Sequence, residues 1–271
     1  MSAAARHNVT FSGVPHGPVI VFAHGFGCDQ RMWRHVAPRF ADRFRVLTFD
    51  NMGAGGADPA GYDPVRHDSL DGYAEDVVQL CGELGVHDAV FVGHSVSSMI
   101  GALATIKAPG MFSRLVMVSP SARFIDEGDY VGGFTEPDIA ELLDSLDSNY
   151  LGWSGAMAPV IMGNPDRPEL GEELAASFCR TDPAVARQFA RVTFLADNRA
   201  DLSEVSVPTL VLQCSDDAIA PVAVGEYVRD ALQDSTYVLL EATGHCPNLS
   251  APEATVAAID AFLAGKLVLS Q

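Results

Sequence analysis

Basic residues are scarce in this sequence. Its 271 residues include 17 Lys and Arg against 35 Asp and Glu, so the formal net charge is −18. A protein that follows a nucleic-acid backbone needs a basic surface to displace counterions, and an acidic chain is repelled by polyanions and anionic membranes. The charge balance therefore predicts neither a nucleic-acid partner nor a membrane partner.

Long hydrophobic runs are missing as well. Residues 1–7 lack the apolar run of a signal peptide, and no stretch reaches the roughly 18 apolar residues of a membrane span. No two cysteines form a C-x-x-C pair, and no cluster of His, Cys and Asp has metal-ligand spacing. We therefore expect a cytoplasmic protein without a metal or other cofactor. Its five cysteines are expected to be buried thiols: Cys28, Cys81, Cys179, Cys214 and Cys246.

Short apolar runs alternate with helical patterns along most of the chain. Hydrophobic residues make up 48% of the sequence, enough for a large core. The runs are apolar almost throughout, as expected for parallel strands covered on both faces. The predicted strands are 18–23, 45–49, 89–92, 115–118, 209–212 and 237–240, and the predicted helices are 71–84, 96–107, 222–232 and 252–264. The fold class is therefore α/β, with a mostly parallel sheet and helices on both faces.

This alternation stops between Ser121 and Val205. Prolines punctuate helical patches there, and no convincing strand is visible. The segment holds 6 basic and 16 acidic residues, a net charge of −10. We predict that residues 1–120 and 206–271 form the core and that residues 121–205 form a helical cap packed over the sheet.

The strand at 89–92 leads directly into Gly93-His94-Ser95-Val96-Ser97 and then into a helical pattern. A nucleophile elbow needs this strand-turn-helix context, with small residues at −2 and +2 of the serine. Gly93 and Ser97 are both small, although the usual motif has glycine at +2, so Ser97 is a departure. The pattern predicts that Ser95 is a nucleophile.

A serine hydroxyl needs a base, and the base needs an orienting carboxylate. His245 follows Gly244 just after the last predicted strand. Asp216 and Asp217 both follow the strand at 209–212; we favour Asp217, because the A-I-A-P after it resembles the stretch after the acid in many α/β-hydrolases, and expect Asp216 to face solvent. His24 and His94 are expected to position the backbone of their motifs. The remaining five are expected at solvated or loop positions: His7, His16, His35, His67 and His87.

A tetrahedral intermediate requires hydrogen-bond donors for its negative charge. The backbone N–H of Val96 comes with the elbow, and the glycines of residues 24–27 allow the Phe26 N–H to point into the site. Residues 53–56 lack the G-x-G-x-x-G spacing of a phosphate-binding loop, so we interpret them as a turn.

With these motifs placed, the chain resembles the α/β-hydrolase superfamily. Within it, the resemblance is to the branch of the bacterial stress-signalling hydrolase RsbQ and the plant karrikin and strigolactone receptors. The resemblance covers nearly the full length, and it is closest to RsbQ at residues 26–30, 165–169, 181–183, 186–190 and 244–247. Residues 51–55 and 95–100 are more similar to the plant receptors.

The resemblance implies a V-shaped four-helix cap over an enclosed apolar pocket. It also implies a catalytic triad of Ser95, Asp217 and His245. From periodicity alone, the aromatic and aliphatic residues that the resemblance assigns to the pocket could equally belong to the core of the cap. The implied pocket residues are Phe26, Phe134, Trp153, Met157, Phe194 and Ile219.

These observations predict a serine hydrolase that cleaves a small, apolar, neutral ester or lactone through an acyl-enzyme. The alternative is a ligand sensor that acts on a partner, which the resemblance to RsbQ implies to be a PAS-domain phosphatase. A C–C hydrolase or an acyl transferase would use the same triad. A haloalkane dehalogenase is disfavoured, because its elbow nucleophile is Asp.

Overall fold

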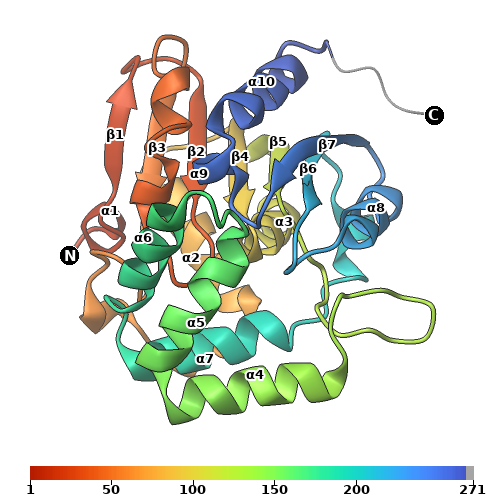
Figure 1. The fold of residues 1–271 in the computed structure, drawn as a ribbon. Helices are drawn as coiled ribbons and strands as arrows, with labels where there is room; N and C mark the ends of the chain where they lie inside the picture. The colour runs from red at the N-terminus through yellow and green to blue at the C-terminus, as the bar shows by residue number, and fades with distance from the viewer. Residues whose placement is uncertain (267–271) are drawn as a thin grey trace.

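A seven-stranded sheet forms the centre of the computed structural model, which describes residues 1–266 (Figure 1). The strand order is β1-β3-β2-β4-β5-β6-β7. The strands are β1 (Thr10–Gly13), β2 (Val19–Ala23), β3 (Arg45–Phe49), β4 (Ala89–His94), β5 (Phe112–Val118), β6 (Thr209–Asp216) and β7 (Ser235–Thr243). The predicted α/β fold class is therefore confirmed.

The six predicted strands match β2 to β7, and all of these pair in parallel. The sequence analysis missed β1, which pairs with β3 antiparallel. All four β1 residues are exposed at the sheet edge, so this strand has no apolar run to reveal it.

Helices cover both faces of the sheet, which is why its central strands are apolar throughout. On β2, Ile20 and Phe22 pack into one core cluster while Val21 packs into the other. One face is covered by α2 (Leu70–Glu83), α3 (Val96–Lys107) and α8 (Val222–Ala231), and the other by α10 (Pro252–Leu263) and two 3-10 helices, Gln30–Trp33 and Ala37–Phe40. The short helices are α1 (Ala3–Arg6) and α9 (Pro247–Ser250).

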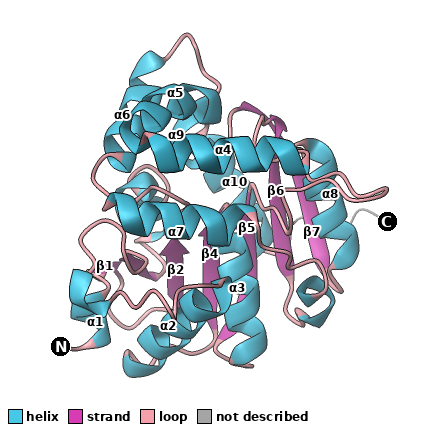
Figure 2. Ribbon diagram, turned by 90° about the horizontal axis from the view of Figure 1, so that it is seen from below, coloured by secondary structure: helices cyan, strands magenta, loops and turns pink. Residues whose placement is uncertain are grey.

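Four helices lie between β5 and β6: α4 (Glu136–Ser148), α5 (Tyr150–Met162), α6 (Pro168–Phe178) and α7 (Pro183–Phe194). Several of the prolines in this segment stand in the first turn of a helix, where the missing N–H costs nothing. Thr135 and Asp138 form a capping box at the start of α4. Figure 2 shows α7 lying between the sheet and α4.

Two expectations about individual residues were wrong. Cys179 is exposed, because it follows the last turn of α6, whereas the other four cysteines are buried. His7 and His67 are buried instead of solvated. His67 Nε2 lies 2.7 Å from the carboxylate oxygen Oδ2 of Asp76, and this partner makes the burial of the His67 ring possible.

No helix within residues 1–266 is both long and apolar enough to cross a membrane.

Candidate active site

Ser95 occupies the sharp turn between β4 and α3. Its φ of 55° and ψ of −123° are unusual for a residue with a side chain. A Cβ atom on Gly93 would lie 2.2 Å from the Ser97 carbonyl oxygen, so no larger residue fits at that position. The tight turn therefore requires glycine at position 93. It holds the Ser95 side chain at the carboxyl end of the sheet.

Ser97, the departure from the usual motif, is used as a hydrogen-bonding residue. Its Oγ donates to the His24 carbonyl oxygen at 2.5 Å and accepts a bond from Asn51 Nδ2 at 3.3 Å. Asn51 Nδ2 also lies 3.2 Å from the His24 carbonyl oxygen. The hydroxyl therefore ties the elbow to the turn that leads to Phe26.

The His24 ring completes this connection. Its Nε2 accepts a bond from the Asn51 backbone N–H at 3.0 Å, so its Nδ1 carries the proton and donates to the Gly25 carbonyl oxygen at 2.9 Å. Gly25 lies so close to the elbow that a Cβ atom there would be 2.5 Å from His94 Nδ1. The turn at residues 24–27 is fixed by these contacts.

Ser95, His245 and Asp217 form a continuous hydrogen-bonded chain. His245 Nε2 lies 2.8 Å from Ser95 Oγ, and His245 Nδ1 lies 2.8 Å from Asp217 Oδ2. Asp217 Oδ1 accepts bonds from the N–H groups of Ile219 and Ala220. Asp216, the other acid that the sequence offers, is exposed.

Electrostatics keep the Asp217 carboxylate ionised. Burial by itself would raise the pKa of this carboxyl, but the attraction of His245, the bond to its ring and two backbone N–H bonds hold the pKa below its ordinary value. An ionised carboxylate at Nδ1 places the proton of neutral His245 on that nitrogen. Nε2 is then free to accept the proton of Ser95.

His94 supports His245 from the other side. Its Nε2–H donates to the His245 carbonyl oxygen at 2.8 Å. Burial, together with the positive charge that His245 can carry, lowers the pKa of His94 to about 3. The ring is therefore neutral at ordinary pH and acts as a fixed donor.

The two expected oxyanion donors are backbone N–H groups that make no hydrogen bond to another residue of the described chain. Within residues 1–266, neither the Phe26 N–H nor the Val96 N–H has a protein acceptor. Val96 opens α3, and the first N–H groups of a helix favour negative charge. Both N–H groups are therefore available to an acceptor other than the described residues.

A small cavity lies beside these residues. Its free space is about 30 Å³, which is room for only one or two water molecules. Ser95 and His245 line it together with five of the six expected pocket residues: Phe26, Trp153, Met157, Phe194 and Ile219. The ring of Phe26 packs against Trp153, Phe178, Phe189 and Phe194, with centroids 5.7–6.1 Å apart.

Phe134 is the expected pocket residue that the structure places elsewhere. It is half-buried, and its backbone pairs with Phe124 and Asp126 in the loop before α4. Phe124 lines the cavity in its place. The sequence analysis also missed Phe178 and Thr193, because nothing in their local pattern distinguishes cavity lining from helix packing.

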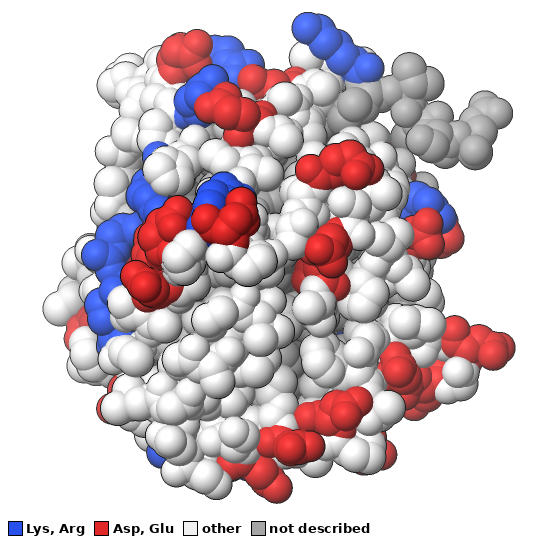
Figure 3. Space-filling model, viewed as in Figure 1, with Lys and Arg blue, Asp and Glu red and all other residues white. Residues whose placement is uncertain are grey.

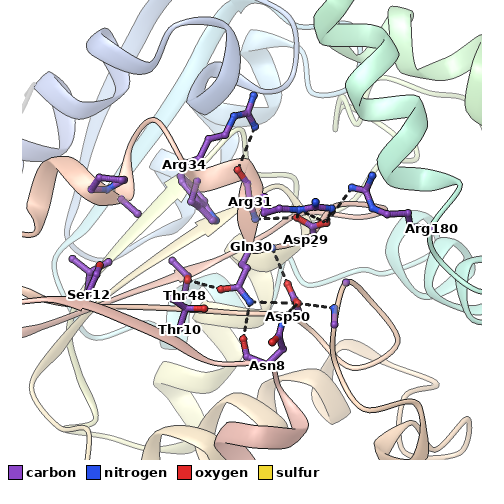
Figure 4. A pocket seen from close by; sticks show the side chains of 16 residues that line it. Asn8, Thr10, Ser12, Asp29, Gln30, Arg31, Arg34, Thr48, Asp50 and Arg180 are labelled. Carbon is purple, nitrogen blue, oxygen red and sulfur yellow. Dashed lines mark hydrogen bonds and ion pairs between the residues drawn. The ribbon is translucent and has the colours of Figure 1, made fainter.

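A larger groove, of about 610 Å³, lies apart from the candidate triad at the β1 edge of the sheet (Figure 4). Its polar groups bond mainly to one another. Asp50 accepts bonds from Asn8, Gly56 and Gln30, and Asp29 binds two arginines. The network fixes the turn that begins at Asp50 and so supports Asn51 behind the candidate active site.

Comparisons with known proteins agree with this geometry. Residues 20–258 match the family described as the alpha/beta hydrolase family. The chain is 40% identical to the karrikin insensitive 2 receptor IA of Petunia hybrida over 88% of this chain and 87% of that protein. It is 37% identical to the strigolactone esterase D14 of Arabidopsis thaliana, over 86% and 88% of the two chains. The structure of olei00960, a hydrolase from Oleispira antarctica, aligns with a TM-score of 0.94 and 37% identity over 97% and 96% of the two chains.

Proposed function

The chain belongs to the alpha/beta hydrolase family as a carboxylic ester hydrolase of esterase or lactonase type, and we propose that it cleaves a small, apolar, neutral ester or lactone on Ser95. The observation that carries this proposal is the hydrogen-bonded chain from Ser95 through His245 to Asp217. Its geometry suits nucleophilic catalysis, in which a base activates a hydroxyl and an acid orients the base.

In the proposed reaction, Ser95 Oγ attacks the ligand carbonyl carbon while His245 Nε2 takes the hydroxyl proton. The resulting oxyanion accepts bonds from the N–H groups of Phe26 and Val96. His245 then gives its proton to the leaving alcohol oxygen, which leaves an acyl group on Ser95. A water molecule, deprotonated by His245, attacks the acyl carbon and releases the acid, while Asp217 stabilises the imidazolium formed in each half-reaction.

The apolar lining supports a neutral ligand, because no charged side chain within residues 1–266 lines the cavity apart from the proposed triad itself. The free space between the lining side chains is only about 30 Å³. We expect lining side chains from the helices of residues 121–205 to shift when a ligand enters. We propose on this ground that residues 121–205 act as a cap over a core formed by 1–120 and 206–271.

The test is turnover of a panel of short-chain aryl esters and butenolide-type lactones. We expect Ser95→Ala and Asp217→Asn to lower kcat by several orders of magnitude, because the triad acts as a unit. Asp216→Asn is the matched control and is expected to retain turnover within about threefold, since Asp216 is exposed. A greater loss in Asp216→Asn than in Asp217→Asn, with both variants folded, would place the acid at 216.

A second candidate function is ligand sensing, in which hydrolysis is secondary. Two observations favour it: side chains from the helices of residues 121–205 line the small cavity beside Ser95, and one relative is named a receptor. A ligand that changes the cap conformation can bias a partner only through different affinities for the two states. We propose a PAS-domain phosphatase as that partner, on the resemblance to RsbQ.

The sensing proposal is tested by ligand-dependent binding of a candidate PAS-domain phosphatase to wild type and to Ser95→Ala. Binding that persists without hydrolysis, and that is lost when exposed residues of α4 are changed, supports sensing. Binding that ignores both the ligand and the α4 surface contradicts it.

A further inference from the structure

Thr193 is a polar residue in the largely apolar cavity beside Ser95. It lies on α7, its exposed fraction is 2%, and it belongs to the cavity lining. Its Oγ1 has no hydrogen-bond partner among residues 1–266. A threonine within a helix commonly bonds to a carbonyl one turn earlier, and a buried hydroxyl without a partner lowers stability. The missing bond at a ligand cavity therefore suggests that the partner is a ligand.

Two other lining residues, His94 and Trp153, also have a buried nitrogen without a partner in the described chain. The His94 Nδ1 atom lies against Gly25, where it packs within the core. The Trp153 indole can only donate a hydrogen bond. The Thr193 hydroxyl differs from both, because it can donate a bond to one ligand oxygen and accept one from another.

Thr193 and the reacting centre come from different elements of the fold. Its neighbour Phe194 packs against Phe26 and Phe124, with ring centroids 6.0 and 5.1 Å apart. Thr193 comes from α7, whereas Ser95 and the Val96 N–H come from the end of β4 and the start of α3. The cavity therefore has polar groups on its sheet side, at His94, Ser95 and His245, and two on its helical side, the Trp153 indole on α5 and the Thr193 hydroxyl on α7.

We infer that Thr193 is a specificity-determining residue that binds a second oxygen of the ligand, a ketone, ether, lactone or hydroxyl oxygen remote from the scissile carbonyl. This inference rests on the proposed hydrolase function and narrows its substrate class. A ligand with a hydrocarbon acyl group leaves the Thr193 hydroxyl without a partner. A ligand carboxylate is disfavoured there, because no lining side chain from α4 to α7 carries a positive charge.

The experiment compares three 4-nitrophenyl esters with acyl groups of equal chain length: pentanoate, 4-oxopentanoate and 3-methoxypropanoate. The measured quantity is the ratio of kcat/KM for each oxygen-bearing ester to that for the pentanoate. Thr193→Val keeps the shape of the side chain and removes the hydroxyl, so we expect the ratio to fall about tenfold for at least one ester. Thr193→Ser is the matched control, which keeps the hydroxyl and should hold that ratio within about twofold.

Thermal unfolding of the ligand-free protein gives a second measurement. Removing a buried hydroxyl that lacks a partner should raise the Tm in Thr193→Val, whereas removing a structural hydroxyl would lower it. Unchanged ratios for both oxygen-bearing esters in Thr193→Val overturn the inference. Pentanoate turnover separates this failure from that of the proposed function: if wild type shows no Ser95-dependent pentanoate turnover, the hydrolase proposal itself fails.

Discussion

The Ser97 hydroxyl connects two turns that the proposed reaction needs. One turn carries Ser95, and the other carries the Phe26 N–H; the link is the bond from Ser97 Oγ to the His24 carbonyl oxygen. Glycine at this position would restore the usual elbow motif and remove the link. The departure from the motif therefore has a structural use, because it holds the proposed oxyanion donor in place.

We predict that Ser97→Gly lowers kcat about tenfold with little change in KM. The Phe26 N–H would lose part of its preorganisation, which matters most when the oxyanion forms. Steady-state kinetics on an aryl ester measures the split between kcat and KM. Ser98→Ala is the matched control, because among the described residues Ser98 Oγ bonds to the Gly93 carbonyl oxygen and not to the turn that carries Phe26. An equal fall in kcat in both variants would contradict a specific role for Ser97.

The neutral state of His94 makes stability depend on pH. The folded protein lowers the pKa of His94 from 6.5 to about 3, so below pH 6.5 the unfolded chain binds the proton and the folded protein does not. The stability that the neutral His94 ring allows is fully present above pH 6.5 and is lost as the pH falls toward 3. Between pH 7.5 and 5.0, the free energy of unfolding measured with urea should fall by about 2 kcal/mol more in wild type than in His94→Gln. Equal losses would show that His94 does not contribute.

At the residue scale, the motifs predicted which three residues the sheet brings together. Ser95, Asp217 and His245 each follow a strand, and the parallel sheet brings these strand ends together. Phe134 was misplaced because its position depends on the loop before α4, which has no local signal. His67 is buried because of Asp76, a partner nine residues away, and the sequence pattern of neither residue reveals the pair.

Side chains from the helices between β5 and β6 line the space beside Ser95. Phe178 ends α6, and its ring packs against Phe26 and Trp153, with centroids 5.8 and 5.5 Å apart. The aromatic ring fills space that an acyl chain would need. This helix end therefore limits the length of acyl group that the cavity accepts.

We predict that Phe178→Leu shifts the preferred acyl chain toward longer esters and lowers the free energy of unfolding by about 1–2 kcal/mol. A series of 4-nitrophenyl esters measures the first effect, and urea unfolding measures the second. Phe112→Leu is the control, because Phe112 is buried against Phe91 on the other face of the sheet. It should lose similar stability without a change in chain-length preference. A shifted preference in both variants would refute the assignment to α6.

Strands and helices were predictable from the sequence where burial is strong. Strands β2 to β6 contribute buried residues to both core clusters, so their apolar runs are continuous, whereas β7 at the far edge is partly exposed. The edge strand β1 is exposed and contains only four residues, so neither length nor hydrophobicity marks it. Helices α4 and α7 have Thr135 and Asp182 as N-caps and a proline in the first turn, a pattern that marks a helix start in the sequence.

The charge of the whole molecule bears on the choice of ligand. Figure 3 shows acidic side chains along α4 and the loop that precedes it, and residues 121–205 carry a net charge of −10. This field repels anions that approach the cavity. An apolar lining then adds the cost of taking a carboxylate out of water.

We predict that 4-nitrophenyl pentanoate has a kcat/KM at least about 100-fold higher than the 4-nitrophenyl monoester of pentanedioic acid at low salt. The two esters differ by one terminal carboxylate. Raising the ionic strength should narrow the gap, because salt screens the field of the surface but leaves the burial cost unchanged. Equal rates at low salt would mean that neither the field nor the lining selects against charge.

The central claim is that Ser95 is the nucleophile, and intact mass after reaction with a serine-directed organophosphorus probe tests it most directly. Ser97→Ala and Ser98→Ala are matched controls, since both hydroxyls are buried in the first turn of α3 close to Ser95. We predict one probe adduct on wild type and on both controls, and none on Ser95→Ala. An adduct of equal yield on Ser95→Ala, or its loss only from Ser97→Ala or Ser98→Ala, would contradict the account.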